Sequence, residues 1–172
     1  MSEPRPGARP VLVTVADLLA TPGRRRELTG RRVLEDLAVG GGAIAGDAVE
    51  LQLVLEAQAG RIICSGEVHA RWELECRRCL GPVLVPVTPD VTEVFEQVPA
   101  EGETFPLEGE VVDLAPMLRE AVLLTLPLAP LCDESCGGPA EGSYYGPPPT
   151  EDEVAGEAPR DPRWAALDDF QP

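Results

Sequence analysis

The sequence predicts an α+β fold in which a curved, barrel-like antiparallel sheet packs against one main amphipathic helix, followed by a disordered acidic carboxy-terminal segment. Two observations carry this prediction. Residues 49–76 contain two stretches of alternating apolar and polar residues around a tight turn, which is the period of half-buried strands. The one clear helical pattern, at residues 113–126, comes after the strands instead of alternating with them. The pattern does not decide whether the sheet closes into a barrel.

The amino-terminal elements are a short strand, a helical turn and a basic strand. PVLVTVADLLATPG (residues 10–23) predicts a strand, then a turn of helix from Asp17 that stops at Pro22 and Gly23. RRRELTGRR (residues 24–32) predicts an exposed basic edge strand. Its arginines are alternatively suited to bind RNA, because the guanidinium fork matches phosphate oxygens. The candidate RNA-binding residues are Arg24, Arg25, Arg26, Arg31 and Arg32.

A long hairpin is the most regular feature of the chain. GGGAIAGDA (residues 40–48) predicts a loop before it, and VELQLVLEAQ (residues 49–58) predicts a half-buried strand. After a turn at Ala59 and Gly60, RIICSGEVHARWELEC resumes the alternation and ends at Cys76. The chain's one histidine, His69, has the opposite phase, so we expect it to be exposed rather than to bind metal.

The second half of the domain predicts an edge strand and the main helix. GPVLVPVTPDVTEVFEQV (residues 81–98) predicts a strand interrupted at two prolines, hence an edge-like or bulged one. PAEGETFPLEGE (residues 99–110) predicts an acidic surface loop. Asp113 is expected to cap the helix, with Pro116 tolerated in its first turn. The apolar face of the helix consists of Leu114, Met117, Leu118, Ala121 and Val122.

These elements predict one domain with flexible ends. Residues 1–9 form a flexible amino terminus, and residues 10–137 form the domain. Residues 138–160 are acidic and rich in proline and glycine, which predicts a disordered linker. Residues 161–172 predict a short helical motif. Trp164 and Leu167 are its candidate partner-binding residues.

Charge is unevenly distributed along the 172 residues, whose formal net charge is −16. Residues 1–32 carry seven arginines against three acidic residues, a net +4, so the remainder carries −20. This excess argues against non-specific adhesion to nucleic acid, and no DNA partner is expected. The acidic part is either a solvated surface or a surface for basic partners such as ribosomal proteins. The chain shows neither a transmembrane-length apolar run nor a signal-peptide pattern, so we expect a cytoplasmic location and no membrane partner.

Four of the five cysteines form two closely spaced pairs. Cys76 and Cys79 have C-x2-C spacing, and Cys132 and Cys136 have C-x3-C spacing, both within the range of zinc sites. The candidate cofactor is therefore one zinc ion. Two local thiol pairs without metal are equally compatible with the spacing. A redox pair is a third reading, since neighbouring arginines lower a thiol pKa, but the βαβ context of thioredoxin is missing.

Other chemical motifs are missing from the sequence. Cys64 is most simply a buried apolar residue. We find no phosphate-binding loop, dinucleotide fingerprint, zincin helix or nucleophile elbow. We therefore expect a protein that is not an enzyme.

Three motifs together are similar to one known family. ECRRCLGPV, then EGEVVDLAPMLREAVLLTLPLAPLC, then the terminal DPRWAAL resemble the YceD family, the large ribosomal RNA subunit accumulation proteins. DLLATPGRRRELT also resembles the start of the high-GC Gram-positive members. The resemblance covers most of residues 10–137 and the last dozen residues. It implies a bacterial cytoplasmic factor with no known catalytic activity that supports synthesis, processing or stability of 23S ribosomal RNA.

The resemblance implies 23S rRNA or its precursors as partners, contacted directly or indirectly. The acidic surface adds ribosomal proteins as candidate partners. The alternative is an acidic protein-binding module that engages a ribosomal protein or another basic partner without contacting RNA.

The cysteine pattern departs from that of many relatives. Cys76 and Cys79 match the family's C-x-R-C turn, and Cys132 and Cys136 match the start of its second cysteine cluster. Many relatives continue that cluster with a further C-x-x-C-G, where this chain reads GGPAEGSYYG. If relatives bind zinc through the second cluster alone, this chain lacks the ligands. If they combine the turn with the first two cysteines of the cluster, all four ligands are present.

Overall fold

The computed structural model describes residues 9–139, and residues 9–138 lie in one compact unit. Within the described residues the elements follow one another in this order: β1 Leu12–Thr14, α1 Ala16–Leu19, β2 Arg25–Val33, β3 Ala38–Val39, β4 Gly42–Ile44, a 3-10 turn Ala45–Asp47, β5 Ala48–Gln58, β6 Arg61–Glu75, β7 Pro82–Val87, β8 Asp90–Glu96, β9 Phe105–Glu108, β10 Val111–Asp113 and α2 Ala115–Leu123.

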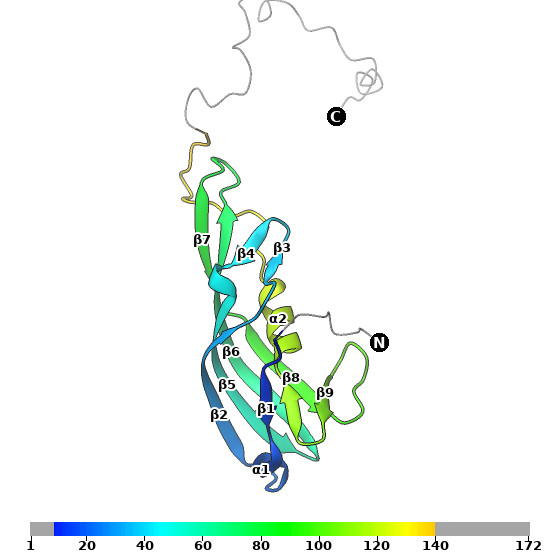
Figure 1. Cartoon of the computed structure of the whole chain (residues 1–172). Helices are drawn as coiled ribbons and strands as arrows, with labels where there is room; N and C mark the ends of the chain where they lie inside the picture. The colour runs from blue at the N-terminus through cyan, green and yellow to red at the C-terminus, as the bar shows by residue number, and fades with distance from the viewer. Residues whose placement is uncertain (1–8, 140–172) are drawn as a thin grey trace, which may run out of the picture. The chain divides into compact units, whose positions relative to one another are not determined.

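The long strand β6 organises the sheet (Figure 1). Its first half, residues 61–69, pairs with β5 on one side and β8 on the other. Its second half, residues 70–75, pairs with β4 and β7. The first half continues outward to β2 beyond β5, and through β9 and β10 to β1 beyond β8. The strands in this sheet pair antiparallel except β8 and β9, which run parallel.

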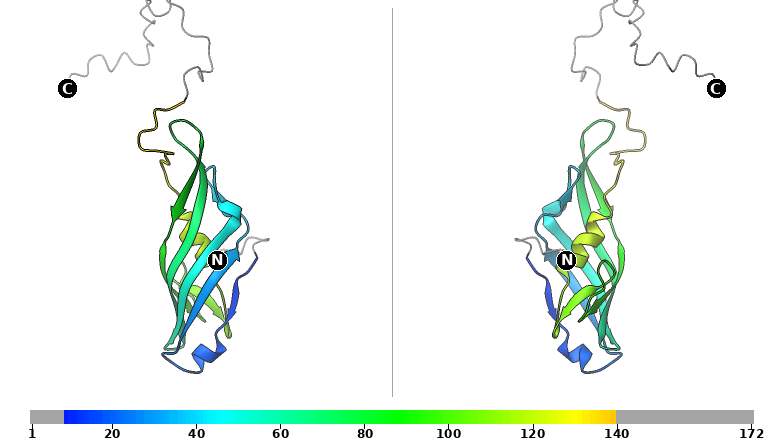
Figure 2. Two further views of the ribbon diagram at one scale, coloured as in Figure 1. Left: turned by 90° about the vertical axis from the view of Figure 1, so that its left-hand side faces the viewer. Right: turned by 90° about the vertical axis from the view of Figure 1, so that its right-hand side faces the viewer.

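The sheet curls into a half-barrel around one side of α2 (Figure 2). Among the described residues, no backbone ladder joins β1 to β2, so the curled sheet stays open there. Arg26 bridges part of this opening, because its Nη2 donates a hydrogen bond to the Thr14 carbonyl oxygen at 2.7 Å. The predicted fold class, a curved sheet on one main helix, is confirmed, except that the parallel pairing of β8 with β9 makes the sheet mixed and not purely antiparallel.

The core fills the space between the curled sheet and the helices. The apolar face of β5 is buried as its alternation predicts, and Trp72 and Phe95 are the largest fully buried side chains. The largest buried residues also include Leu18, Leu34, Leu37, Leu51, Leu53, Leu55, Ile62, Leu114, Met117 and Leu118. No helix within residues 9–139 is long and apolar enough to cross a membrane.

Two of the loop predictions are wrong in part. The stretch at 40–48 contains β4, in which Gly42 is buried. A Cβ atom at Gly42 would lie 2.3 Å from Leu74 Cδ2, so this glycine permits close packing on β6 rather than loop flexibility. The acidic stretch at 99–110 ends in β9, which forms a hairpin with β10 and places Leu107 in the core.

The main helix is shorter than predicted, Ala115–Leu123 instead of 113–126. The N-cap residue is Leu114 and not the predicted Asp113, although Asp113 Oδ1 accepts a hydrogen bond from the Ala115 amide at 3.0 Å and so satisfies one amide of the first turn. At the other end, Thr125 Oγ1 accepts a hydrogen bond from Trp72 Nε1 at 3.2 Å and donates one to the Val122 carbonyl oxygen at 2.6 Å. These hydrogen bonds hold the chain against β6 at the point where it leaves the helix. From there the chain continues toward the second cysteine pair.

Candidate metal centre

The first cysteine pair lies in the turn between β6 and β7. Cys76 follows the last residue of β6 and is fully buried. Its amide donates to the Gly81 carbonyl oxygen at 2.7 Å, and the Leu80 amide donates back to the Cys76 carbonyl oxygen at 2.9 Å. Leu80 has φ +60, a left-handed conformation that lets the chain reverse tightly. Strand β6 thus fixes Cys76, and the tight turn fixes Cys79.

The second pair lies in the irregular segment after α2, where Asp133 closes a small turn. The Cys136 amide donates to the Asp133 carbonyl oxygen at 3.0 Å, and the Ser135 amide donates to Asp133 Oδ1 at 2.8 Å. The Ser135 hydroxyl donates to the same carboxylate oxygen. The hydrogen bond from the Ser135 hydroxyl, and then that from the Ser135 amide, lower the pKa of Asp133. Asp133 therefore closes the turn that holds Cys132 and Cys136 near each other in space.

The two arginines between Cys76 and Cys79 join the two turns. The Arg77 amide donates to the Pro130 carbonyl oxygen at 2.9 Å, and Arg77 Nη1 approaches the Leu128 carbonyl oxygen at 3.4 Å. Arg78 Nη1 donates to the carbonyl oxygens of Glu134 and Cys136, each at 2.9 Å. Sequence reasoning missed this role, because nothing in the spacing says which carbonyl oxygens the arginines meet.

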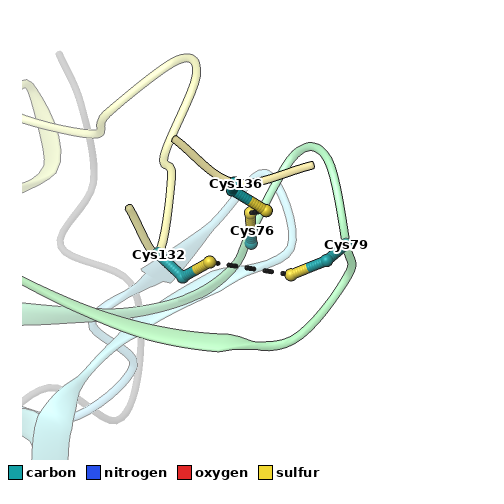
Figure 3. A group of neighbouring side chains, drawn as sticks. All are labelled: Cys76, Cys79, Cys132 and Cys136. Atoms are coloured by element: carbon teal, nitrogen blue, oxygen red, sulfur yellow. Dashed lines mark hydrogen bonds between the residues drawn. The ribbon is translucent and has the colours of Figure 1, made fainter. Parts of the chain in front are cut away.

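The four sulfur atoms form one compact group (Figure 3). Cys76 Sγ lies 3.8 Å from Cys136 Sγ, and Cys79 Sγ lies 3.7 Å from Cys132 Sγ. All four sulfur atoms lie within 4.8 Å of one another, and all four thiols are free. Ligands at a Zn–S distance of about 2.3 Å in a tetrahedron are separated by about 3.8 Å. The donor set and its spacing therefore fit a zinc ion bound by four thiolates.

The protonation of these thiols is uneven. The backbone amide of Cys79, then those of Cys132 and Arg78, lower the pKa of Cys76 to about 6. Hydrogen bonds with the side chains of Cys136, then Cys79 and Cys76, raise the pKa of Cys132 to about 12. Cys76 therefore loses its proton more readily than Cys132. A bound cation favours deprotonation of every coordinating thiol.

The candidate RNA-binding arginines do not share one face. Cross-strand pairing puts Arg25 and Arg31 opposite Glu56 and Glu50, on the outer face of the sheet. Arg26 and Arg32 lie on the other face, opposite the core residues Leu55 and Val49. The prediction of an edge strand is confirmed, because among the described strands β2 pairs only with β5.

Three of these arginines have carboxylate partners. Arg25 Nε lies 2.6 Å from Glu56, and Asp17 lies 3.2 Å from Arg26 and 3.8 Å from Arg24. Within residues 9–139, Arg31 and Arg32 have no carboxylate partner. Trp164 and Leu167, the linker beyond residue 139 and residues 1–8 lie outside the described residues.

The remaining singled-out residues lie apart from the cysteine group. Cys64 is fully buried, as expected, and burial raises its pKa to about 12, with a smaller effect from Glu93. His69 is partly exposed on β6, and its Nδ1 lies 3.1 Å from Thr88 Oγ1. Neither residue belongs to the four-sulfur group.

Comparison with known proteins gives a consistent result. The family model described as large ribosomal RNA subunit accumulation protein YceD matches residues 64–171. The chain is 31% identical to an uncharacterized protein of Mycobacterium tuberculosis strain H37Rv, and 31% identical to one of Mycobacterium bovis. Each alignment covers 93% of this chain and 81% of the relative. No solved structure matches the chain significantly.

Proposed function

The chain belongs to the YceD family of large ribosomal RNA subunit accumulation proteins, and we propose that it is a non-enzymatic, cytoplasmic ribosome biogenesis factor. In this role it supports the synthesis, processing or stability of 23S rRNA. The supporting observation is the family match over residues 64–171, which includes both cysteine pairs and α2. Its partners are 23S rRNA or its precursors, directly or indirectly, and ribosomal proteins.

The four cysteines are proposed to hold one zinc ion as a structural centre. Four thiolates complete a tetrahedral site, which leaves no open position for a substrate. A redox role confined to Cys76 and Cys79 gives no reason for Cys132 and Cys136 to join the same group, whereas a metal centre does. Zinc would fasten the segment after α2 to the end of β6.

We propose that Arg24 and the arginines of β2 contact RNA directly. Arg31 and Arg32 are the better placed, since within residues 9–139 no carboxylate neutralises them. The pairs made by Arg24, Arg25 and Arg26 are on the surface, where an ion pair contributes roughly 0–1 kcal/mol. A phosphate can therefore replace these carboxylates at small cost.

The second candidate function is an acidic module that binds a basic protein and does not touch RNA. One observation favours it: three of the five candidate arginines are already paired with carboxylates of the chain. Outside residues 1–32 the chain carries −20, which repels RNA and attracts basic proteins.

Depletion of the protein in its own cells tests the ribosomal role. We expect less 23S rRNA relative to 16S rRNA and fewer complete large subunits. Complementation by the wild-type gene should restore both, which controls for effects on neighbouring genes. Unchanged 23S rRNA and large-subunit assembly would leave the proposal without support.

RNA binding at several salt concentrations separates the two candidate functions. Each phosphate contact that is lost lowers the slope of log K against log[salt] by about 0.7–0.9. The R31Q/R32Q variant should lower the slope more than R24Q/R25Q, which removes the same charge from paired arginines. Binding that is absent in the wild type, or unaffected by either variant, favours the acidic module.

A further inference from the structure

An apolar groove with carboxylates along it lies between β8 and α2. It has a volume of about 280 Å³, and its walls include Val91, Phe105, Met117 and Ala121. On the helix side, Met117, Glu120, Ala121 and Leu124 follow one another at the spacing of a single helix face. Leu124 is 79% exposed, a large apolar side chain without cover at the end of this face. The groove is thus an unpartnered apolar surface of the domain.

Glu93 is the unexpected residue in this groove. It lies between Val91 and Phe95 on the core-facing side of β8, and it pairs across the sheet with the buried Cys64. The alternation of β8 calls for an apolar residue at this position. Among residues 9–139, neither an ion pair nor a side-chain hydrogen bond satisfies Glu93. The chain therefore places a half-buried, unpaired carboxylate in an apolar wall.

A second carboxylate makes this arrangement less favourable for the isolated protein. Glu120 faces Glu93 from α2, and Asp90 lies at the same groove. Burial, and then the charge of Glu120, raise the pKa of Glu93. Among the described residues, the groove lining contains no arginine or histidine to offset these negative charges. A cationic group entering the groove would pair with two carboxylates in surroundings that are less screened than open surface.

We propose that this groove binds a basic segment of a partner protein, with an arginine or lysine between Glu93 and Glu120 and an apolar residue against Leu124. Charge complementarity supports this occupant, since carboxylates attract a basic peptide and repel RNA phosphates. The apolar floor suits the alkyl stem of the basic side chain. The groove does not depend on the cysteine centre. It rests on the proposed ribosomal role only in that the partner would then be a large-subunit ribosomal protein.

A labelled short peptide in which arginine and leucine alternate is a suitable probe for the full-length protein, measured by fluorescence anisotropy near physiological salt. The E93Q/E120Q variant should bind it at least about tenfold more weakly, because two charge-assisted contacts are lost. The E73Q/E108Q variant, which removes two exposed carboxylates outside the groove, should bind it as the wild type does. A peptide with citrulline in place of arginine should bind weakly to all three proteins.

Three outcomes would overturn the groove proposal. One is equal binding by E93Q/E120Q and E73Q/E108Q, and another is equal binding of the citrulline peptide. The third concerns Arg160 and Arg163, which lie outside the described residues. If R160Q/R163Q binds the peptide more tightly than the wild type, and adding E93Q/E120Q removes that gain, the chain's own arginines are the occupant. Peptide binding together with normal 23S rRNA after depletion would refute the ribosomal role alone. Reduced 23S rRNA after depletion, without peptide binding, would refute the groove alone.

Discussion

Arg78 donates a hydrogen bond to the Cys136 carbonyl oxygen at 2.9 Å, while the Cys136 sulfur lies 3.8 Å from the sulfur of Cys76. Arg78, the second of the two arginines between Cys76 and Cys79, thus positions the backbone that carries Cys136. Contacts of this kind around a metal site typically change metal affinity by about 10–100-fold.

The Arg78→Gln variant is therefore expected to bind zinc about tenfold more weakly than the wild type while retaining one zinc per chain at saturation. Competition with a chromophoric chelator measures the affinity. Arg71→Gln is the matched control, because Arg71 is exposed on β6 outside the cysteine group. Equal zinc affinities of the two variants would show that the Arg78 contacts do not position the site.

The hydrogen bond between Trp72 and Thr125 should contribute measurably to stability. Thr125→Val leaves the indole N–H of a fully buried tryptophan without its acceptor, which costs about 1–3 kcal/mol. Urea unfolding measures this loss, with the exposed Thr92→Val as the control. In a Trp72→Phe background the same substitution should cost less, because no indole N–H remains. An equal cost in both backgrounds would assign the effect to other contacts of Thr125.

Glycine is required at position 66 by a close approach between β6 and β5. A Cβ atom there would lie 2.1 Å from the Gln52 carbonyl oxygen, and Gly66 has φ +139. Gly66→Ala should therefore destabilise the domain by about 3 kcal/mol or more, from backbone strain and steric overlap together. Thermal unfolding measures the change. Gly137→Ala is the control, since open space surrounds Gly137. Similar stability of both variants would contradict this geometry of the sheet.

Replacement of Glu93 should stabilise the folded protein at neutral pH. Burial and Glu120 raise the pKa of Glu93, with Asp90 at the same groove and Cys64 opposite on β6. A carboxyl group with a raised folded-state pKa is protonated more readily in the folded state, so its ionisation destabilises the fold as pH rises. Below pH about 4.3 the group is mostly protonated in both states and this destabilisation is absent.

The free energy of unfolding of E93Q, relative to the wild type, is therefore expected to increase from acid to neutral pH. Urea titrations at several pH values measure this difference. Glu73→Gln, which removes an exposed carboxylate outside the groove, is the control. An E93Q difference that stays constant over the pH range would mean that Glu93 is not strained by its surroundings.

Long alternating stretches and the short strand β1 were predictable, whereas the short strands β4, β9 and β10 were not. The pattern of β5 and β6 continues over many residues, so its period identifies the hairpin without knowledge of the fold. Strands β9 and β10 each bury a single apolar residue, Leu107 and Val112, which is too few to show a period. The parallel pairing of β8 with β9 depends on the whole sheet and has no local signal.

The candidate site was predictable in its residues but not in its assembly. C-x2-C and C-x3-C spacing identifies potential ligands, because such turns let two sulfur atoms face one ion. Whether the two pairs meet depends on where the chain goes after α2. The Trp72–Thr125 hydrogen bond, and that of the Arg77 amide to Pro130, direct it back to the end of β6. The groove at Glu93 was missed, since a single carboxylate inside a strand resembles an ordinary surface residue.

The zinc content of the anaerobically purified full-length protein tests the central structural claim most directly. Elemental analysis should find one zinc per chain in the wild type and in C64A, whose thiol lies outside the four-sulfur group. It should find none in C76S/C79S. An anaerobically purified wild-type protein without zinc, or C76S/C79S with its full zinc content, would contradict the four-cysteine centre.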